Sequence, residues 1–215
     1  MKKTYWKRRV CVLAGGGSDS SVLVAQRLAL GWEVHPLYVR SGFIWESAEL
    51  YWLRRFLRGL RSPRLKPLVV VEAPMGSIIP GHWGLSGRGV PATGSSWDSV
   101  YLPGRNLVLL SQAAVYCGRA DIGLVEMAVL KGNPFRDAQP RFLKMMGRAS
   151  GEALGRPIRF SAPYRLLSKE RVLALVPDFP TELTFSCLRP KGLRHCGACS
   201  KCEERLMVIG PSPRS

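Results

Sequence analysis

The chain has 215 residues, of which 46% are hydrophobic and 22% are charged, and its formal net charge at pH 7 is +17. This composition excludes a disordered chain, and no apolar run is long enough to span a bilayer. The positive charge indicates an anionic ligand such as a nucleotide, pyrophosphate or RNA, or else a basic surface with no specific role. Arginines are spread along the whole chain, which favours a general positive field over a dedicated nucleic-acid-binding arm.

Short apolar segments alternate with segments of helical periodicity. We expect strands at 10–13, 34–39, 68–71, 122–126 and 158–161, and helices at 20–30, 45–60, 106–117, 140–148 and 169–175. The basic segment before residue 10 runs directly into the first strand and is interpreted as part of the fold, not as a signal peptide. Residues 75–104 are rich in Gly, Ser and Pro and are expected to form a long functional loop. The alternation predicts an α/β fold with helices on both faces of a parallel sheet.

The turn after the first strand reads CVLAGGGSDSSVLVAQRL. Its three glycines, Gly15 to Gly17, allow the backbone to approach a ligand, and their N–H groups together with the next helix form a cradle for an oxyanion. Asp19 and Ser20 stand at the helix start, where the same residue types also serve as simple caps. The loop is neither a Walker A motif nor a G-x-G-x-x-G turn in the Rossmann register. Alone, it indicates anion binding without identifying the ligand.

A second motif lies near the C-terminus, where four cysteines are spaced C-x8-C-x2-C-x2-C. They are Cys187, Cys196, Cys199 and Cys202. Four thiolates at this spacing predict a closed tetrahedral zinc site that builds structure and performs no chemistry. An iron–sulfur cluster, a pair of disulfides and four unrelated thiols are the alternatives. Cysteines in a metal-ligand pattern favour a reducing cytoplasm. We expect two units, an α/β domain at 1–180 and a zinc-binding segment at 181–215.

The two motifs together resemble a known family. Gly16-Gly17-Ser18-Asp19-Ser20 is similar to the pyrophosphate-binding SGGxDS loop of the N-type ATP pyrophosphatases, the PP-loop superfamily. Within it, the 7-cyano-7-deazaguanine synthases are matched by 101–106 (V-P-x-R-N), by 161–169 (T-P with a later lysine) and by the zinc knuckle with its closing arginine at 205. The resemblance spans about residues 9–206 and implies a Rossmann-like fold of the adenine nucleotide alpha hydrolase type.

The resemblance also implies an activity. Members convert 7-carboxy-7-deazaguanine and ammonia to a nitrile through an acyl-adenylate, in queuosine biosynthesis, with ATP as cosubstrate and with Mg²⁺ and structural zinc. It implies catalytic roles for Asp19, Ser20 and Lys169. It implies nucleotide contacts from ten residues, which are Leu13, Ala14, Gly15, Gly16, Gly17, Ser18, Asp19, Ser20, Arg105 and Asn106. The alternatives are a surface ion pair for Arg105 and a solvent-facing lysine at a helix start for Lys169. The family resemblance also suggests a homodimer.

This chain departs from the family pattern at two places. Gly15 replaces the first serine of the loop, whose hydroxyl normally helps to hold phosphate. The substrate segment D-x-S-x-Y-P-D-C is replaced by KGNPFRDA at 131–138, where Asp137 matches the second aspartate. One hypothesis is therefore that this chain acts on a different acid substrate. There are two other hypotheses. One is a tRNA-modifying ATP pyrophosphatase, which the positive charge supports but which is not favoured. The other is a non-enzymatic nucleotide-binding relative.

Overall fold

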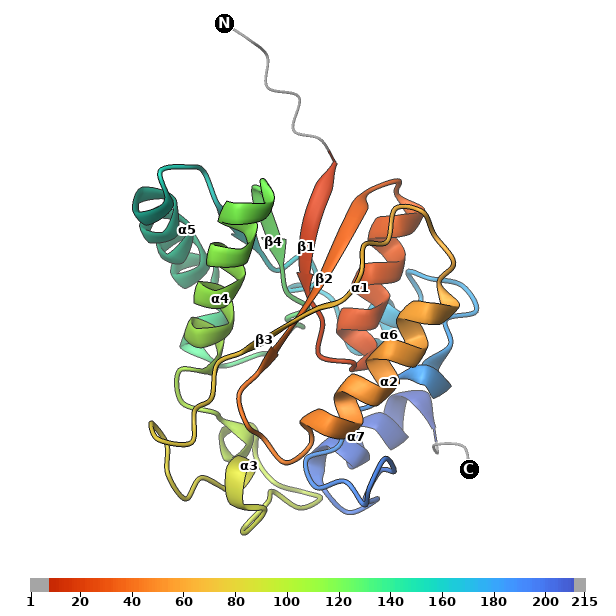
Figure 1. Ribbon diagram of the computed structural model, residues 1–215. Helices are drawn as coiled ribbons and strands as arrows, with labels where there is room; N and C mark the ends of the chain where they lie inside the picture. Colours follow the sequence, from red (N-terminus) through yellow and green to blue (C-terminus); the bar gives the residue numbers. More distant parts are fainter. Residues whose placement is uncertain (1–7, 211–215) are drawn as a thin grey trace, which may run out of the picture.

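The computed structural model describes residues 8–210, which are built around a parallel sheet of five strands (Figure 1). The sheet order is β3-β2-β1-β4-β5. The strands are β1 (Arg9–Leu13), β2 (Glu33–Arg40), β3 (Val69–Glu72), β4 (Leu124–Glu126) and β5 (Arg159–Ser161). Val10, Cys11 and Val12 in the central strand are fully buried, so β1 is apolar on both faces, as a parallel sheet covered by helices requires. The predicted α/β class is confirmed.

Helices cover both faces of the sheet. One face carries α1 (Ser18–Ala29), α2 (Glu46–Gly59) and α6 (Lys169–Leu173), and the other carries α4 (Arg105–Ala120) and α5 (Pro140–Leu154) (Figure 1). Two hydrophobic cores result, one around Leu23, Leu53 and Phe56 and the other around Leu110 and Phe160. None of the helices in the described part of the chain is both long and apolar enough to cross a membrane.

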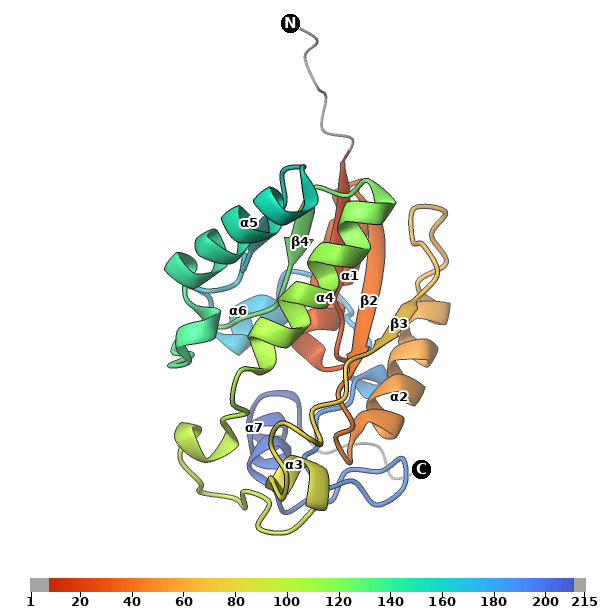
Figure 2. The same cartoon turned by 60° about the vertical axis from the view of Figure 1, so that its left-hand side comes forward.

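The segment at 75–104, expected as a loop, contains two short helical pieces, α3 (Trp83–Ser86) and the 3-10 helix η1 (Trp97–Val100). It lies beyond the carboxyl ends of the strands together with α7 (Ser200–Ile209), as both views show (Figure 2). The remaining elements are two 3-10 turns, η2 (Arg136–Ala138) and η3 (Thr181–Leu183). The division into units at 1–180 and 181–215 stays a prediction.

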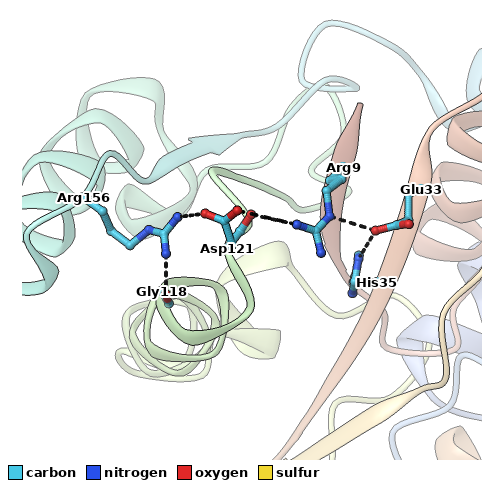
Figure 3. Close-up of polar contacts among 6 residues, drawn as sticks. All are labelled: Arg9, Glu33, His35, Gly118, Asp121 and Arg156. Carbon is cyan, nitrogen blue, oxygen red and sulfur yellow. Dashed lines mark hydrogen bonds and ion pairs between the residues drawn. The ribbon is translucent and has the colours of Figure 1, made fainter. Parts of the chain in front are cut away.

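A chain of polar contacts joins the amino-terminal ends of the strands, at the opposite end of the sheet from α7 (Figure 3). Arg9 on β1 bonds Glu33 on β2 at 2.8 Å, and Glu33 also bonds the His35 ring at 2.9 Å. Arg9 reaches the backbone of Asp121, which follows α4, and Arg156 pairs with the Asp121 carboxylate. The network therefore ties β1 and β2 to the end of α4 and to the turn before β5.

Candidate functional site

A cleft of about 360 Å³ opens at the carboxyl ends of β1, β2 and β4. The chain leaves β1 toward α1 on one face of the sheet, whereas the helices next to β4 lie on the other face. The loops after these two neighbouring strands therefore diverge and leave a crevice between them, which is the position where open α/β sheets bind ligands. Nine of the ten residues expected to contact nucleotide line this cleft, and Gly16 is the exception.

Gly16 shapes the loop from outside the cleft. Its φ is +77°, and a side-chain Cβ at this position would lie 2.8 Å from the backbone oxygen of Glu49 on α2. The Gly16 carbonyl accepts a hydrogen bond from the N–H of Phe185 at 2.8 Å. The Ser20 hydroxyl accepts from the N–H of Gly15 at 3.3 Å and donates to the carbonyl of Gly17 at 3.2 Å. Ser20 therefore holds the loop in shape.

Asp19 does not cap α1, because the N-cap is Gly17 and receives no side-chain hydrogen bond. Instead its carboxylate lies 3.6 Å from the ammonium of Lys169. Lys169 also bonds Glu204 at 2.5 Å, and Glu204 bonds Lys201 at 2.6 Å. Lys169 begins α6 as expected, but its side chain is only 11% exposed and lines the cleft, which contradicts the solvent-facing alternative.

The two carboxylates control the charge state of Lys169. Burial by itself lowers the pKa of this lysine, but Asp19 and Glu204 outweigh it and raise the pKa above its ordinary value. Burial raises the pKa of Glu204, and Lys201 and Lys169 outweigh that effect and lower it to about 2. Lys169 and Glu204 are therefore both charged at neutral pH. Glu204 and Lys201 come from the knuckle helix α7, and sequence reasoning did not include them in the site.

Arg105 and Asn106, at the start of α4, take different roles in the cleft. The Arg105 guanidinium lies over the ring of Phe43, 5.7 Å from its centre. No acidic partner lies within ion-pair distance of it in residues 8–210, so the surface ion-pair alternative is wrong. Asn106 is held by Asp137, which accepts from its backbone N–H at 3.2 Å and from its side-chain amide at 3.1 Å. Asp137 itself lines the cleft.

A fourth carboxylate lines the cleft beside those of Asp19, Asp137 and Glu204, and sequence reasoning missed it. The Glu49 side chain accepts a hydrogen bond from the Tyr38 hydroxyl at 2.7 Å, and both residues line the cleft. Burial raises the pKa of Glu49 to about 7, while Arg105 and the Tyr38 hydrogen bond act in the opposite direction and Glu46 adds to the rise. Glu49 lies in the first turn of the amphipathic helix α2, where acidic residues are common because they offset the helix dipole, so no local sequence signal marks it.

The four predicted metal ligands converge. The Sγ atoms of Cys187, Cys196, Cys199 and Cys202 all lie within 4.8 Å of one another. The Sγ of Cys199 is 3.4 Å from that of Cys202 and 4.0 Å from that of Cys187. Tetrahedral zinc with bonds of about 2.3 Å places its sulfurs about 3.8 Å apart, so the geometry fits zinc. All four thiols are free, which rules out the disulfide alternative.

Backbone donors surround the sulfurs, as expected where thiolates carry charge. The N–H groups of Leu188, Cys196 and Ala198 point at the sulfurs of Cys199, Cys187 and Cys196, at 3.4, 3.3 and 3.4 Å. The His195 ring stacks on Phe185 with centroids 4.4 Å apart and accepts a hydrogen bond from the N–H of Ser186. His195 therefore supports the knuckle, and the four cysteines are the residues that would hold the metal.

Fold and site together define a class: a doubly wound parallel α/β protein with a polar cleft at the switch point and a cluster of four cysteines whose geometry suits a zinc ion. Comparison with known protein families shows which family of this class the chain belongs to. The chain matches the family described as "Queuosine biosynthesis protein QueC" over residues 9–209, and it belongs to that family.

Curated relatives agree with this assignment. The chain is 28% identical to 7-cyano-7-deazaguanine synthase 1 of Desulfitobacterium hafniense, with 94% of this chain and 92% of the relative covered. It is 31% identical to the 7-cyano-7-deazaguanine synthase of an Anaeromyxobacter species, covering 91% and 88%. A solved structure described as a predicted subunit of a tRNA methyltransferase from Methanocaldococcus jannaschii has a TM-score of 0.50 and 12% identity, covering 78% of this chain and 73% of that one. That likeness shows the fold alone.

Proposed function

We propose that this protein is an ATP-dependent carbon–nitrogen ligase that converts 7-carboxy-7-deazaguanine and ammonia to the nitrile through an acyl-adenylate. The observation that carries the proposal is the convergence of the glycine loop, the Asp19–Lys169 pair and Arg105 on one cleft. A carboxylate is a poor electrophile, so its oxygen must first be attached to AMP, with release of pyrophosphate. The membership of the chain in the QueC family supplies the substrate class.

The side chains can be given roles in this reaction. The backbone of the glycine loop and the amino terminus of α1 hold the leaving pyrophosphate, because the first N–H groups of a helix have no partner within it and attract an anion. Lys169 and Arg105 stabilise the negative charge that spreads over the phosphates during adenylation. Asp19 is the carboxylate that would hold Mg²⁺, which neutralises phosphate charge when bound. The aromatic ring of Tyr101, which lines the cleft and is 42% exposed, offers a face for the deazapurine ring.

The test is pyrophosphate release from ATP by the zinc-loaded protein, with 7-carboxy-7-deazaguanine and with or without ammonia. We expect release that depends on the acid, and formation of the nitrile only when ammonia is present. Release that requires tRNA and not the acid would instead support the tRNA-modifying alternative, which the net charge of +17 keeps open. ATP binding without any release would support a non-enzymatic relative.

A further inference from the structure

The roles proposed for side chains in the adenylation reaction do not include Glu49. This residue lies on α2, directly behind the glycine loop, because its backbone oxygen is the atom that a Cβ on Gly16 would meet at 2.8 Å. Its side chain is partly buried and lines the same cleft as Asp19 and Lys169. An acid that shares the phosphate-binding cleft is unfavourable for binding anions, so its presence calls for a cationic ligand or a proton.

The hydrogen bonding of Glu49 leaves one oxygen available. Its Oε2 accepts from the Tyr38 hydroxyl at 2.7 Å, and within residues 8–210 no hydrogen bond is made to its Oε1. The neighbouring acid Glu46 is occupied differently, because it accepts from the backbone N–H groups of Ser41 and Gly42 at 2.6 and 3.2 Å. Glu49 is therefore the carboxylate of this pair that can contact a ligand.

The surroundings of Glu49 suit a proton acceptor. The charged and titratable groups that act on it are Tyr38 on β2, Glu46 on its own helix and Arg105 on α4. Burial raises the pKa of Glu49 to about 7, and the opposing effects of Arg105 and Tyr38 keep it from rising further. A base works best when its pKa lies near the operating pH, because it is then both ionised and able to hold a proton.

We propose that Glu49 binds ammonium in the cleft and takes one of its protons, with Tyr38 fixing the orientation of the carboxylate. The inference deepens the proposed function and rests on it. Ammonia exists mainly as ammonium at neutral pH, as amines generally do, and ammonium has no lone pair with which to attack. A base that lines the same cleft as Asp19 and Lys169 removes this obstacle where the reaction occurs.

The step balances as follows. Ammonium enters with four hydrogens and gives one proton to the Glu49 carboxylate, which frees the nitrogen lone pair. That pair forms the C–N bond to the acyl carbon, while the bond from this carbon to the AMP oxygen breaks and AMP leaves with the electrons. A second proton passes from the new C–N nitrogen to water, so the amide retains two hydrogens. Glu49 then releases its proton to solvent.

The test is Glu49→Gln, which keeps the size of the side chain and an oxygen that can accept from Tyr38, but removes the base. We expect acid-dependent exchange of pyrophosphate into ATP to stay within about twofold of the native rate. Ammonia-dependent amide formation should fall about 100-fold or more, the usual contribution of a general base. The pH profile of amide formation should also lose its rise near pH 7. Hydroxylamine, which is mostly neutral at pH 7, should give hydroxamate at similar rates in both proteins.

Two further variants complete the experiment. Tyr38→Phe leaves the base in place without its orienting hydrogen bond, so we expect a loss of about 10-fold in amide formation alone. Glu152→Gln, on α5 outside the cleft, is the matched control and should change neither reaction. If Glu49→Gln leaves the rate of amide formation unchanged, or lowers pyrophosphate exchange and amide formation equally, the proposed role of Glu49 is wrong. The proposed function of the protein is not affected by either result. A native protein that releases no pyrophosphate contradicts the proposed function, and the role of Glu49 falls with it.

Discussion

Gly15 and Gly16 are neighbours in the chain but meet different steric limits. Gly15 does not have a positive φ, and a Cβ on it would meet nothing within 4 Å. We therefore expect Gly15→Ser to be tolerated and to restore the hydroxyl that resembling loops carry. One added hydrogen bond to a charged group is worth on the order of 1.5–3 kcal/mol before ordering costs, so ATP should bind up to about tenfold more tightly, as measured by calorimetry.

Gly16→Ser is the matched control for that experiment. Its φ of +77° and the 2.8 Å approach to the Glu49 carbonyl leave no room for a side chain, so this variant should lose ATP binding. Unchanged affinity in Gly15→Ser would indicate that this loop does not bind the pyrophosphate of ATP.

Asp19 is the residue at which a catalytic and a structural role are most clearly separated. Because Gly17 and not Asp19 occupies the cap position, Asp19→Asn removes no cap. We expect the variant to fold with a melting temperature close to that of the native protein and to lose pyrophosphate release by 100-fold or more, since the charge beside Lys169 is removed. Thermal unfolding and pyrophosphate release measure the two effects, and full activity of the variant would remove Asp19 from the site.

At the scale of secondary-structure elements, the Glu33 network gives a prediction about pH. Hydrogen bonds from His35, Arg9 and Lys66 lower the pKa of Glu33 to about 2 despite partial burial, whereas an unfolded glutamate has a pKa of about 4.3. A depressed folded-state pKa adds stability that is complete above the unfolded value and is lost as the pH falls toward 2. Glu33→Gln should therefore destabilise the protein by on the order of 1 kcal/mol at pH 7, and by progressively less between pH 5 and pH 2.

Urea unfolding of the native protein and the Glu33→Gln variant at several pH values measures this difference. Glu72→Gln is a suitable control, because Glu72 pairs with Arg40 at 3.2 Å but is 65% exposed. Its effect should be no more than a few tenths of a kcal/mol at any pH. A destabilisation by Glu33→Gln that does not vary with pH would contradict the electrostatic explanation.

Elements were more predictable than the contacts between them. The alternation of apolar strands and helices was sufficient for the α/β class, and the helix expected at 106–117 exists as Arg105–Ala120. The strand order was not predictable, because it depends on packing across two cores and not on local periodicity. In the cleft, the glycine loop and Lys169 carried motifs, whereas Glu49, Tyr38 and Glu204 lie in ordinary helix and strand patterns and become neighbours only through the tertiary fold.

At the scale of the whole molecule, the zinc knuckle and the cleft form one structure. Cys187 and Glu204 line the cleft, and Glu204 is bonded to Lys169 across it. The segment that leads into η1 is fastened to the knuckle, since the Pro91 carbonyl accepts from the N–H of Ser200 and the Gly94 N–H donates to Glu203 at 2.8 Å. The four-cysteine knuckle, which borders the cleft, therefore holds two of its walls in place.

This coupling predicts what loss of the metal does. Metal analysis of the native protein should find one zinc per chain, and Cys199→Ser should lower both the zinc content and the melting temperature, because a structural zinc site contributes folding free energy directly. The same variant should bind ATP more weakly, since Glu204 and the segment before η1 lose their anchor. Cys117→Ala is the control: Cys117 is buried in the other core, so this variant should lose some stability but retain its zinc. Native-like melting and ATP affinity in a zinc-free Cys199→Ser protein would show that the knuckle and the cleft are independent.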